Sequence, residues 1–186
     1  IKEVGVELYQ QMLEEAVAAA KGGLEDEEAD GTWSPQINLG ATVLIPEHYV
    51  PDLNLRMSLY RRIAELEDGN AVQGLAAEMI DRFGELPNEV DQLFRIIEIK
   101  QFAKAAGISR IEAGVKGMTI SFRNDRFANP AAMVTFVSSL KSKAKLRPDH
   151  RLVFFLKMDD VDARLNNAFK VARKLASLAA QVKAAA

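Results

Sequence analysis

Hydrophobic residues keep helical spacing over three consecutive segments in the middle of the chain. They recur at steps of three and four residues, which is typical of helices that bury one side. Short breaks at 68–70 and 84–86 separate them, so we expect neighbouring helices that form a compact helical subdomain. The predicted helices cover residues 52–67, 71–83 and 87–106.

The junction between the second and third of these helices is sharply marked. Gly84 is expected to end the earlier helix in a left-handed backbone conformation. Pro87, whose backbone torsion suits a first helical turn, is expected to start the next helix. The residues predicted to form the buried stripe before this corner are Val72, Leu75, Ala76, Met79, Ile80 and Phe83. Glu78 and Asp81 lie one turn apart on the same helix, away from that stripe. They form an acidic pair at its edge.

The spacing of hydrophobic residues changes to two after Gly107. Segments 108–113 and 118–122 alternate as strands do, and the glycines at 114 and 117 predict a hairpin turn between them. A helix over 130–140 capped by Asn129, a basic connection over 141–151, a short strand over 152–156 and a helix over 159–182 follow. Gln36–Ile45 also alternates and predicts a strand. The whole pattern predicts an α+β fold, in which a helical subdomain packs with a small, mostly antiparallel sheet.

The first 35 residues predict a different organisation. Residues 1–22 have helical spacing up to the Gly22-Gly23 break, and residues 23–35 are acidic and poor in hydrophobic side chains. We interpret them as a separate N-terminal helix and a flexible linker, followed by one domain over 36–186. The first residue is Ile, which favours a fragment of a longer polypeptide.

Composition excludes several classes of protein. The 186 residues are 48% hydrophobic, enough for an ordinary globular core, and they contain no cysteine. A disulfide framework, a thiolate zinc site and a cysteine nucleophile are therefore excluded. No apolar run has the length of a membrane span, and the chain does not begin with a signal peptide pattern. We expect a cytoplasmic protein with no membrane partner.

Charge is distributed very unevenly along the chain. The net charge is −2, but residues 1–99 hold 7 Lys and Arg against 20 Asp and Glu, whereas residues 100–186 hold 17 against 6. The two halves either attract each other in the fold or present opposite fields to different partners.

Residues for catalysis are scarce. The chain lacks the GxxxxGK[ST] loop that cradles nucleotide phosphates, and its glycine pairs are better explained as turns. His48 and His150 lie in predicted loops, without the spacing of a metal site or a triad. We therefore expect a non-catalytic chain with no catalytic, cofactor or metal residues.

Two charged groups remain as candidate contact sites, and each has an ordinary explanation. Glu78 can pair with Arg82 one turn later, or the acidic pair Glu78 and Asp81 can recognise arginines of a partner. The basic run Lys141, Lys143, Lys145, Arg147 and Arg151 is either a solvated connection or a phosphate contact. No aromatic residue is interleaved with it, so the run itself does not predict stacking on bases.

Three segments together resemble the C-terminal region of bacterial transcription-repair coupling factors. They are VGVELYQQMLEEAV near the start, INLGATVLIPEHYVPDLNLRMSLYRRIAELE in the middle, and AEMIDRFGELPNEVDQLFRIIEIKQFAKAAGI after it. The resemblance is strongest from Ile37 to about Gly117 and is looser after Met118.

The resemblance implies a place in a larger machine. Members of that family are translocases that use ATP and Mg²⁺ in motor domains preceding this region, act on double-stranded DNA, remove stalled RNA polymerase and recruit the excision-repair protein UvrA. Residues 1–21 resemble the end of the motor segment. The C-terminal domain resembles a regulatory clamp that masks the UvrA-binding domain of the same protein. The family's acidic contact positions correspond to Glu78 and Asp81. A module that contacts DNA through the basic half is the alternative.

Overall fold

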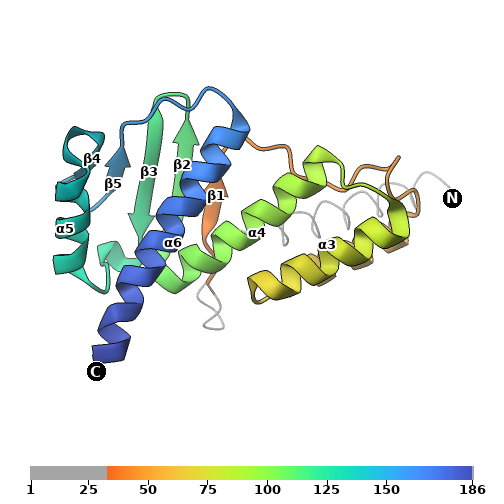
Figure 1. The fold of residues 1–186 in the computed structure, drawn as a ribbon, viewed down its shortest axis with the longest axis horizontal. Coiled ribbons are helices and arrows are strands. Elements are labelled where there is room, and N and C mark those ends of the chain that lie inside the picture. Colours follow the sequence, from red (N-terminus) through yellow and green to blue (C-terminus); the bar gives the residue numbers. More distant parts are fainter. Residues whose placement is uncertain (1–32, 186) are drawn as a thin grey trace, which may run out of the picture. The chain divides into compact units, whose positions relative to one another are not determined.

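The computed structural model describes residues 33–185 (Figure 1). They separate into two compact units: the first is mainly Thr42–Glu98, and the second combines Ser34–Ala41 with Ile99 onward. The helices are α2 (Leu53–Ala64), α3 (Gly69–Phe83), α4 (Asn88–Ala106), α5 (Pro130–Ser139) and α6 (Val161–Ala185). The strands are β1 (Gln36–Asn38), β2 (Ile108–Gly114), β3 (Gly117–Phe122), β4 (Ala144–Leu146) and β5 (Leu152–Phe154). Two short 3₁₀ turns, η1 (Arg123–Asp125) and η2 (Lys141–Lys143), complete this part of the chain.

The first unit contains α2, α3 and the first part of α4, and each of these three helices lies within about three residues of its expected ends. Aspartates start two of them: the side chain of Asp52 accepts from the Leu55 N–H, and that of Asp68 accepts from the Ala71 N–H. Their hydrophobic stripes form a buried core that includes Leu59, Tyr60, Ile63, Val72, Leu75, Met79, Val90 and Leu93. The spacing of hydrophobic residues was therefore a correct guide to these helices.

Two tyrosines fix the irregular segment that precedes α2. The buried Tyr60 hydroxyl accepts a 2.6 Å hydrogen bond from the Ile45 N–H. The Tyr49 hydroxyl lies 3.1 Å from the Met79 carbonyl and 2.9 Å from the Gly84 carbonyl, both in the last turn of α3 or just beyond it. The segment therefore ties its polar atoms to α2 and α3, which satisfies groups that would otherwise be buried without partners.

The corner between α3 and α4 differs in detail from the prediction. Gly84 has the expected positive φ of 92°, but its ψ of −167° lies outside the left-handed helical region. Its N–H still bonds to the Ile80 carbonyl at 2.9 Å. Pro87 precedes α4 rather than opening it, and its carbonyl accepts from the Val90 and Asp91 N–H groups. Only glycine adopts the Gly84 conformation without strain.

The second unit is built on a five-stranded sheet in the order β1-β2-β3-β5-β4. β1 is parallel to β2, and the other neighbouring pairs are antiparallel. The α+β class and the mostly antiparallel sheet are confirmed. Two expectations were wrong: the first strand ends at Asn38 rather than Ile45, and the basic connection contains β4. Because β4 has only three residues, its alternation was too short to recognise.

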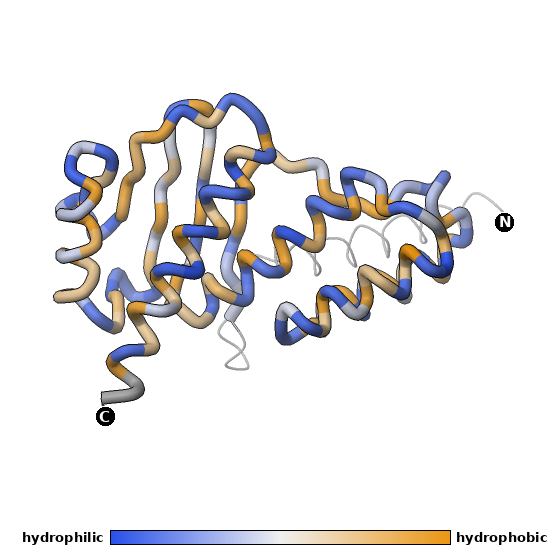
Figure 2. Tube along the Cα trace, viewed as in Figure 1, coloured by the Kyte–Doolittle hydropathy of each residue, from blue (hydrophilic) through white to orange (hydrophobic). Residues whose placement is uncertain are grey.

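Helices cover one face of this sheet, and α6 crosses it in Figure 1. The strand register places one set of buried side chains on that face: Ile111, Ile120 and Leu152 in one row, and Met118, Phe154 and Ala144 in the next. Figure 2 shows hydrophobic positions recurring along α6 and the central strands. Phe102 of α4 and Phe169 of α6 meet edge to face, with ring centroids 5.4 Å apart.

The close approach of β3 and β5 explains why residue 117 is a glycine. A Cβ atom on Gly117 would overlap the Phe154 carbonyl oxygen and lie 3.3 Å from its carbon. β3 can therefore pair with β5 at this point only if residue 117 lacks a side chain.

Some predictions lie outside the described residues, namely the helix over 1–22 and all but the last three residues of the linker over 23–35. Along 33–185, none of the helices has both the length and the hydropathy needed to cross a bilayer.

Candidate interaction surfaces

Glu78, the first predicted contact residue, is held by arginines of its own fold. Arg62 of α2 binds both of its carboxylate oxygens, at 2.8 Å and 2.6 Å. Arg82 adds the predicted bond one turn along α3, at 3.0 Å. The sequence indicated Arg82 but gave no sign of Arg62, because the latter is 16 residues away on another helix. A paired, fork-shaped contact of this kind fixes the carboxylate in one orientation.

These bonds change the acidity of Glu78. Hydrogen bonds from Arg62 first, and from Arg82 second, lower the pKa of Glu78 from 4.5 to about 2. The same bond raises the pKa of Arg62. Glu78 is therefore ionised near neutral pH, and its charge is already compensated by two cations.

Asp81 lies on the exposed side of α3 and makes no ion pair with the residues that the structure describes. Beside it, Ile80 is 48% exposed, although the spacing of hydrophobic residues placed it in the buried stripe. That prediction was wrong, because the buried side of α3 is narrow and centres on Val72, Leu75 and Met79. Gly74 and Ala77 are exposed as well. We call Gly74, Ala77, Ile80 and Asp81 the α3 edge.

The α3 edge combines features that suit contact with another protein. Small residues let a partner backbone approach, one exposed isoleucine offers an apolar anchor, and one carboxylate offers a charge. The fold brings Glu78 next to this edge with its own arginines attached. Sequence reasoning singled out the two carboxylates and placed Ile80 in the buried stripe instead of on this edge.

The second predicted group, Lys141, Lys143, Lys145 and Arg147, lies along the sheet edge formed by η2 and β4. All four side chains are exposed. Arg151 stands opposite Arg147, where the Arg147 N–H donates to the Arg151 carbonyl at 2.8 Å. The structure therefore gathers these cations on one β hairpin instead of spreading them along a loop.

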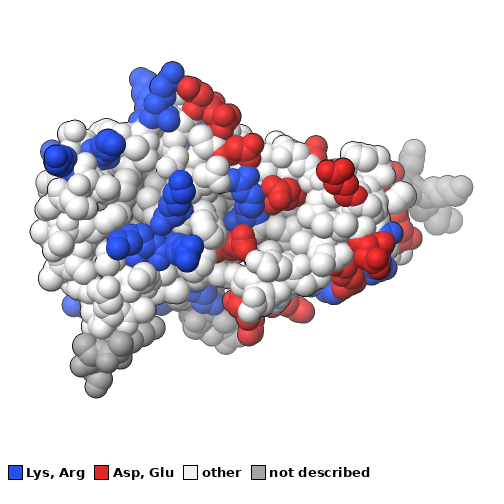
Figure 3. Space-filling view, in the orientation of Figure 1, with Lys and Arg blue, Asp and Glu red and all other residues white. Residues whose placement is uncertain are grey.

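The charge asymmetry is visible on the surface. In Figure 3, Asp and Glu side chains are concentrated over the helical unit, and Lys and Arg over the sheet unit. The two surfaces belong to different compact units.

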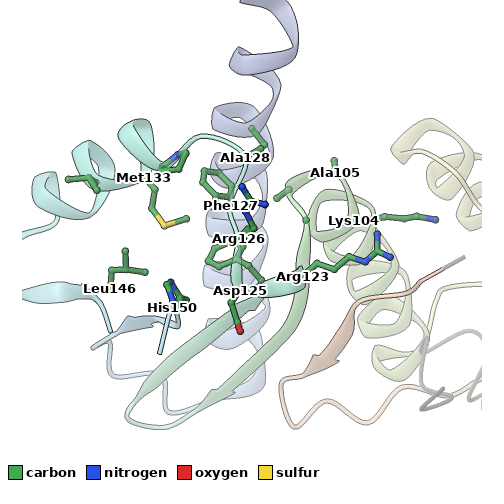
Figure 4. A pocket seen from close by; sticks show the side chains of 16 residues that line it. Lys104, Ala105, Arg123, Asp125, Arg126, Phe127, Ala128, Met133, Leu146 and His150 are labelled. Carbon is green, nitrogen blue, oxygen red and sulfur yellow. The ribbon is translucent and has the colours of Figure 1, made fainter. Parts of the chain in front are cut away.

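A cavity of about 710 Å³ opens in the sheet unit, beside α5 and the end of β3. Met133, Phe127 and Leu146 supply apolar walls, and Arg126, Asp125 and His150 are among its polar residues (Figure 4). His150 is exposed in the β4–β5 turn, as expected of a loop histidine. The described residues contain no group of three or more His, Asp or Glu suited to a metal ion.

The comparison with known families decides what kind of chain this is. The family model for the TRCF domain matches residues 39–133, which include the α3 edge and the α3–α4 corner. This chain belongs to the TRCF domain family. The resemblance inferred from the segments between Ile37 and Gly117 is confirmed.

Curated relatives agree with this assignment. The chain is 43% identical over 161 residues to the transcription-repair-coupling factor of Rickettsia bellii (strain RML369-C), covering 85% of this chain. It is 31% identical over 176 residues to that of Escherichia coli (strain K12), covering 94%. The chain spans 14% and 15% of the lengths of these two relatives.

A solved structure shows the same fold. The crystal structure of the C-terminal domain of transcription-repair coupling factor superposes with a TM-score of 0.68, at 21% identity. The match covers 80% of this chain and 95% of that one. The TRCF domain fold therefore extends over most of the chain.

Proposed function

We propose that this chain is the regulatory end of a transcription-repair coupling factor and that its α3 edge docks on the UvrA-binding domain of the same protein. When the α3 edge is docked, it masks the surface that UvrA recognises. The parent protein is then an ATP-dependent translocase on double-stranded DNA that acts on stalled RNA polymerase. Membership of the TRCF domain family supports a place in a transcription-repair coupling factor. The exposure of Ile80 and Asp81 supports the choice of the α3 edge as the contact surface.

We assign different roles to the two carboxylates. Asp81 is exposed and has no ionic partner among the described residues, so it is the group that can receive an arginine from the docked domain. Glu78 acts mainly by holding Arg62 and Arg82 in place. Without Glu78, the two cations that it now binds would stand uncompensated and repel an approaching arginine.

The contact suits a releasable latch. It offers one apolar side chain and a few polar groups rather than a broad hydrophobic patch. A partner that binds only the open state can shift such an equilibrium if it supplies a few kcal/mol of differential affinity. Engagement of polymerase would provide that energy in the parent protein.

The test is a calorimetric titration of this chain with the UvrA-binding domain of its parent. We expect Ile80→Ala with Asp81→Ala to weaken binding at least tenfold, or about 1.4 kcal/mol. Glu78→Ala should weaken it by a smaller factor because its effect is indirect. Glu67→Gln removes an exposed carboxylate outside the α3 edge and should leave the affinity unchanged.

A companion measurement uses the full-length parent protein. The Ile80→Ala, Asp81→Ala variant should bind UvrA more tightly than the unaltered protein, since its mask is weakened. Unchanged affinity in both assays would show that the α3 edge is not the latch.

A further inference from the structure

The face of the sheet opposite the helices carries chemistry that the α3 edge does not use. Strand register gives its composition, because side chains alternate between the two faces. Ala144, Leu152 and Phe154 point to the helix-covered core, so Lys145 and Val153 point the other way. We call this second surface the open sheet face.

Three rows of residues cross the open sheet face. The middle row contains Asn38, Glu112, Thr119, Val153 and Lys145. A second row follows from the paired residues Gln36, Arg110 and Ser121 and from the backbone bond that joins Arg147 to Arg151. The third contains the paired glycines Gly114 and Gly117, together with Phe155 and Lys143, which a 2.8 Å backbone bond joins.

Phe155 is the unusual member of this face. It is 55% exposed, although the phenylalanine beside it, Phe154, is only 3% exposed in the core. Its neighbour on β3 is Gly117, whose ideal Cβ position lies 3.7 Å from the Phe155 Cα. Glycine has no side chain to cover the ring, so the exposed part of Phe155 can accept a flat partner.

The charges around Phe155 have mainly one sign. Residues 141–157 contain six Lys and Arg and one carboxylate, Asp149, which lies 3.9 Å from Arg151. One of the six, Lys157, pairs with Asp159 at 3.1 Å. Across the sheet, Glu112 is near Arg110 at 3.8 Å. Lys143, Lys145 and Arg147 are exposed along one edge of the face, and the two central positions, Thr119 and Val153, are small. The surface is therefore a sheet face with exposed cations along its β4 edge.

We propose that the open sheet face binds single-stranded DNA, with phosphates along Lys143, Lys145 and Arg147 and a base stacked on Phe155. Cations that follow a phosphate backbone together with an exposed aromatic ring are the features that bind single strands without sequence preference. A base inside a duplex cannot stack on a protein ring, so Phe155 favours a single strand over a duplex. DNA, rather than RNA, rests on the proposed function in repair. The basic run alone did not predict stacking, and the fold supplies the aromatic residue from the position that follows β5.

The test measures fluorescence anisotropy of a labelled 15-nucleotide oligothymidylate titrated with the 186-residue chain. We expect binding that weakens between 50 and 200 mM salt and is tighter than binding to a 15-base-pair duplex. Phe155→Ala should weaken single-strand binding by about tenfold, and Phe155→Trp should retain it, since stacking contributes about 1–3 kcal/mol per base. Lys145→Gln with Arg147→Gln should reduce the salt slope by about 1.4.

Matched controls separate this surface from general effects. Val134→Ala removes another exposed hydrophobic side chain, on α5, and Lys170→Gln with Arg173→Gln removes two exposed cations from α6. Both should leave the affinity unchanged. Circular dichroism of Phe155→Ala should match the unaltered chain, because the ring is mostly exposed.

Several results would overturn the proposal. Absence of oligothymidylate binding at 50 mM salt is one, and equal affinity for duplex with no effect of Phe155→Ala is another. Tighter binding to oligouridylate, to an acidic peptide or to anionic vesicles would assign the face to a different partner. Ile80 and Asp81 are unchanged in all of these variants. A negative result for single-stranded DNA would therefore not alter the expected binding of the α3 edge to the UvrA-binding domain.

Discussion

The two charged surfaces of this protein differ in how far neighbouring side chains compensate their charges. On α3, the best-placed carboxylate is bound by Arg62 and Arg82, so the fold compensates most of its own charge and leaves Asp81 and Ile80 exposed. On the β4–β5 hairpin, the cations are exposed and few carboxylates lie near them. A run of like charges in a sequence therefore does not reveal whether the field reaches a partner. Only the neighbours in space decide it.

The largest effect on stability is expected from a substitution that blocks the close approach of β3 and β5 in the open sheet face. Gly117→Ala places a methyl group against the Phe154 carbonyl, which is backbone and cannot rotate away. We expect the sheet unit to lose about 3 kcal/mol of stability, the upper end of the usual cost of overpacking. Denaturant unfolding monitored by hydrogen exchange of β3 and β5 measures it. Equal loss in α2 and α3 would show that the two units do not unfold separately.

A smaller loss is expected at the corner that supports the α3 edge. Gly84→Ala has no atom within 4 Å of its new methyl group, so the whole cost, about 1–3 kcal/mol, comes from backbone strain at φ of 92°. Gly74→Ala, inside α3, is the matched control, also with open space around it. It should instead stabilise the chain by about 0.5–1 kcal/mol. Thermal unfolding of both variants tests whether Gly84→Ala lowers the free energy of unfolding and Gly74→Ala raises it. Unchanged stability of Gly84→Ala would contradict the backbone strain predicted at residue 84.

The subtlest effect concerns the electrostatics of Glu78. With its pKa lowered from 4.5 to about 2, the ion pair contributes stability above pH 4.5 and loses that contribution as the pH falls toward 2. Arg62→Gln should raise the pKa of Glu78, because only Arg82 then remains. A carboxyl-detected NMR titration measures the shift. Arg61→Gln, which removes the neighbouring cation on α2, should leave the pKa unchanged. Equal shifts in both variants would indicate a general field rather than a specific bond.

Much of the architecture could be predicted from local sequence. The Asp52, Asp68 and Asn129 caps place helix starts, because each side chain bonds to an N–H three residues later in the same segment. The Gly114 to Gly117 turn likewise defines its hairpin. β4 was missed because three residues give too little alternation, and Ile80 was misplaced because helical spacing shows which residues are neighbours, not how wide the buried side is.

The candidate sites divide in the same manner. The sequence by itself determined that α3 carries two carboxylates one turn apart, that the later part of the chain is basic, and that the segments between Ile37 and Gly117 resemble a known family. Only the tertiary structure decided that Arg62 holds Glu78 and that Phe155 lies beside Lys143. Both facts depend on contacts between separate helices or strands, and such contacts follow from packing and register rather than from the order of neighbouring residues.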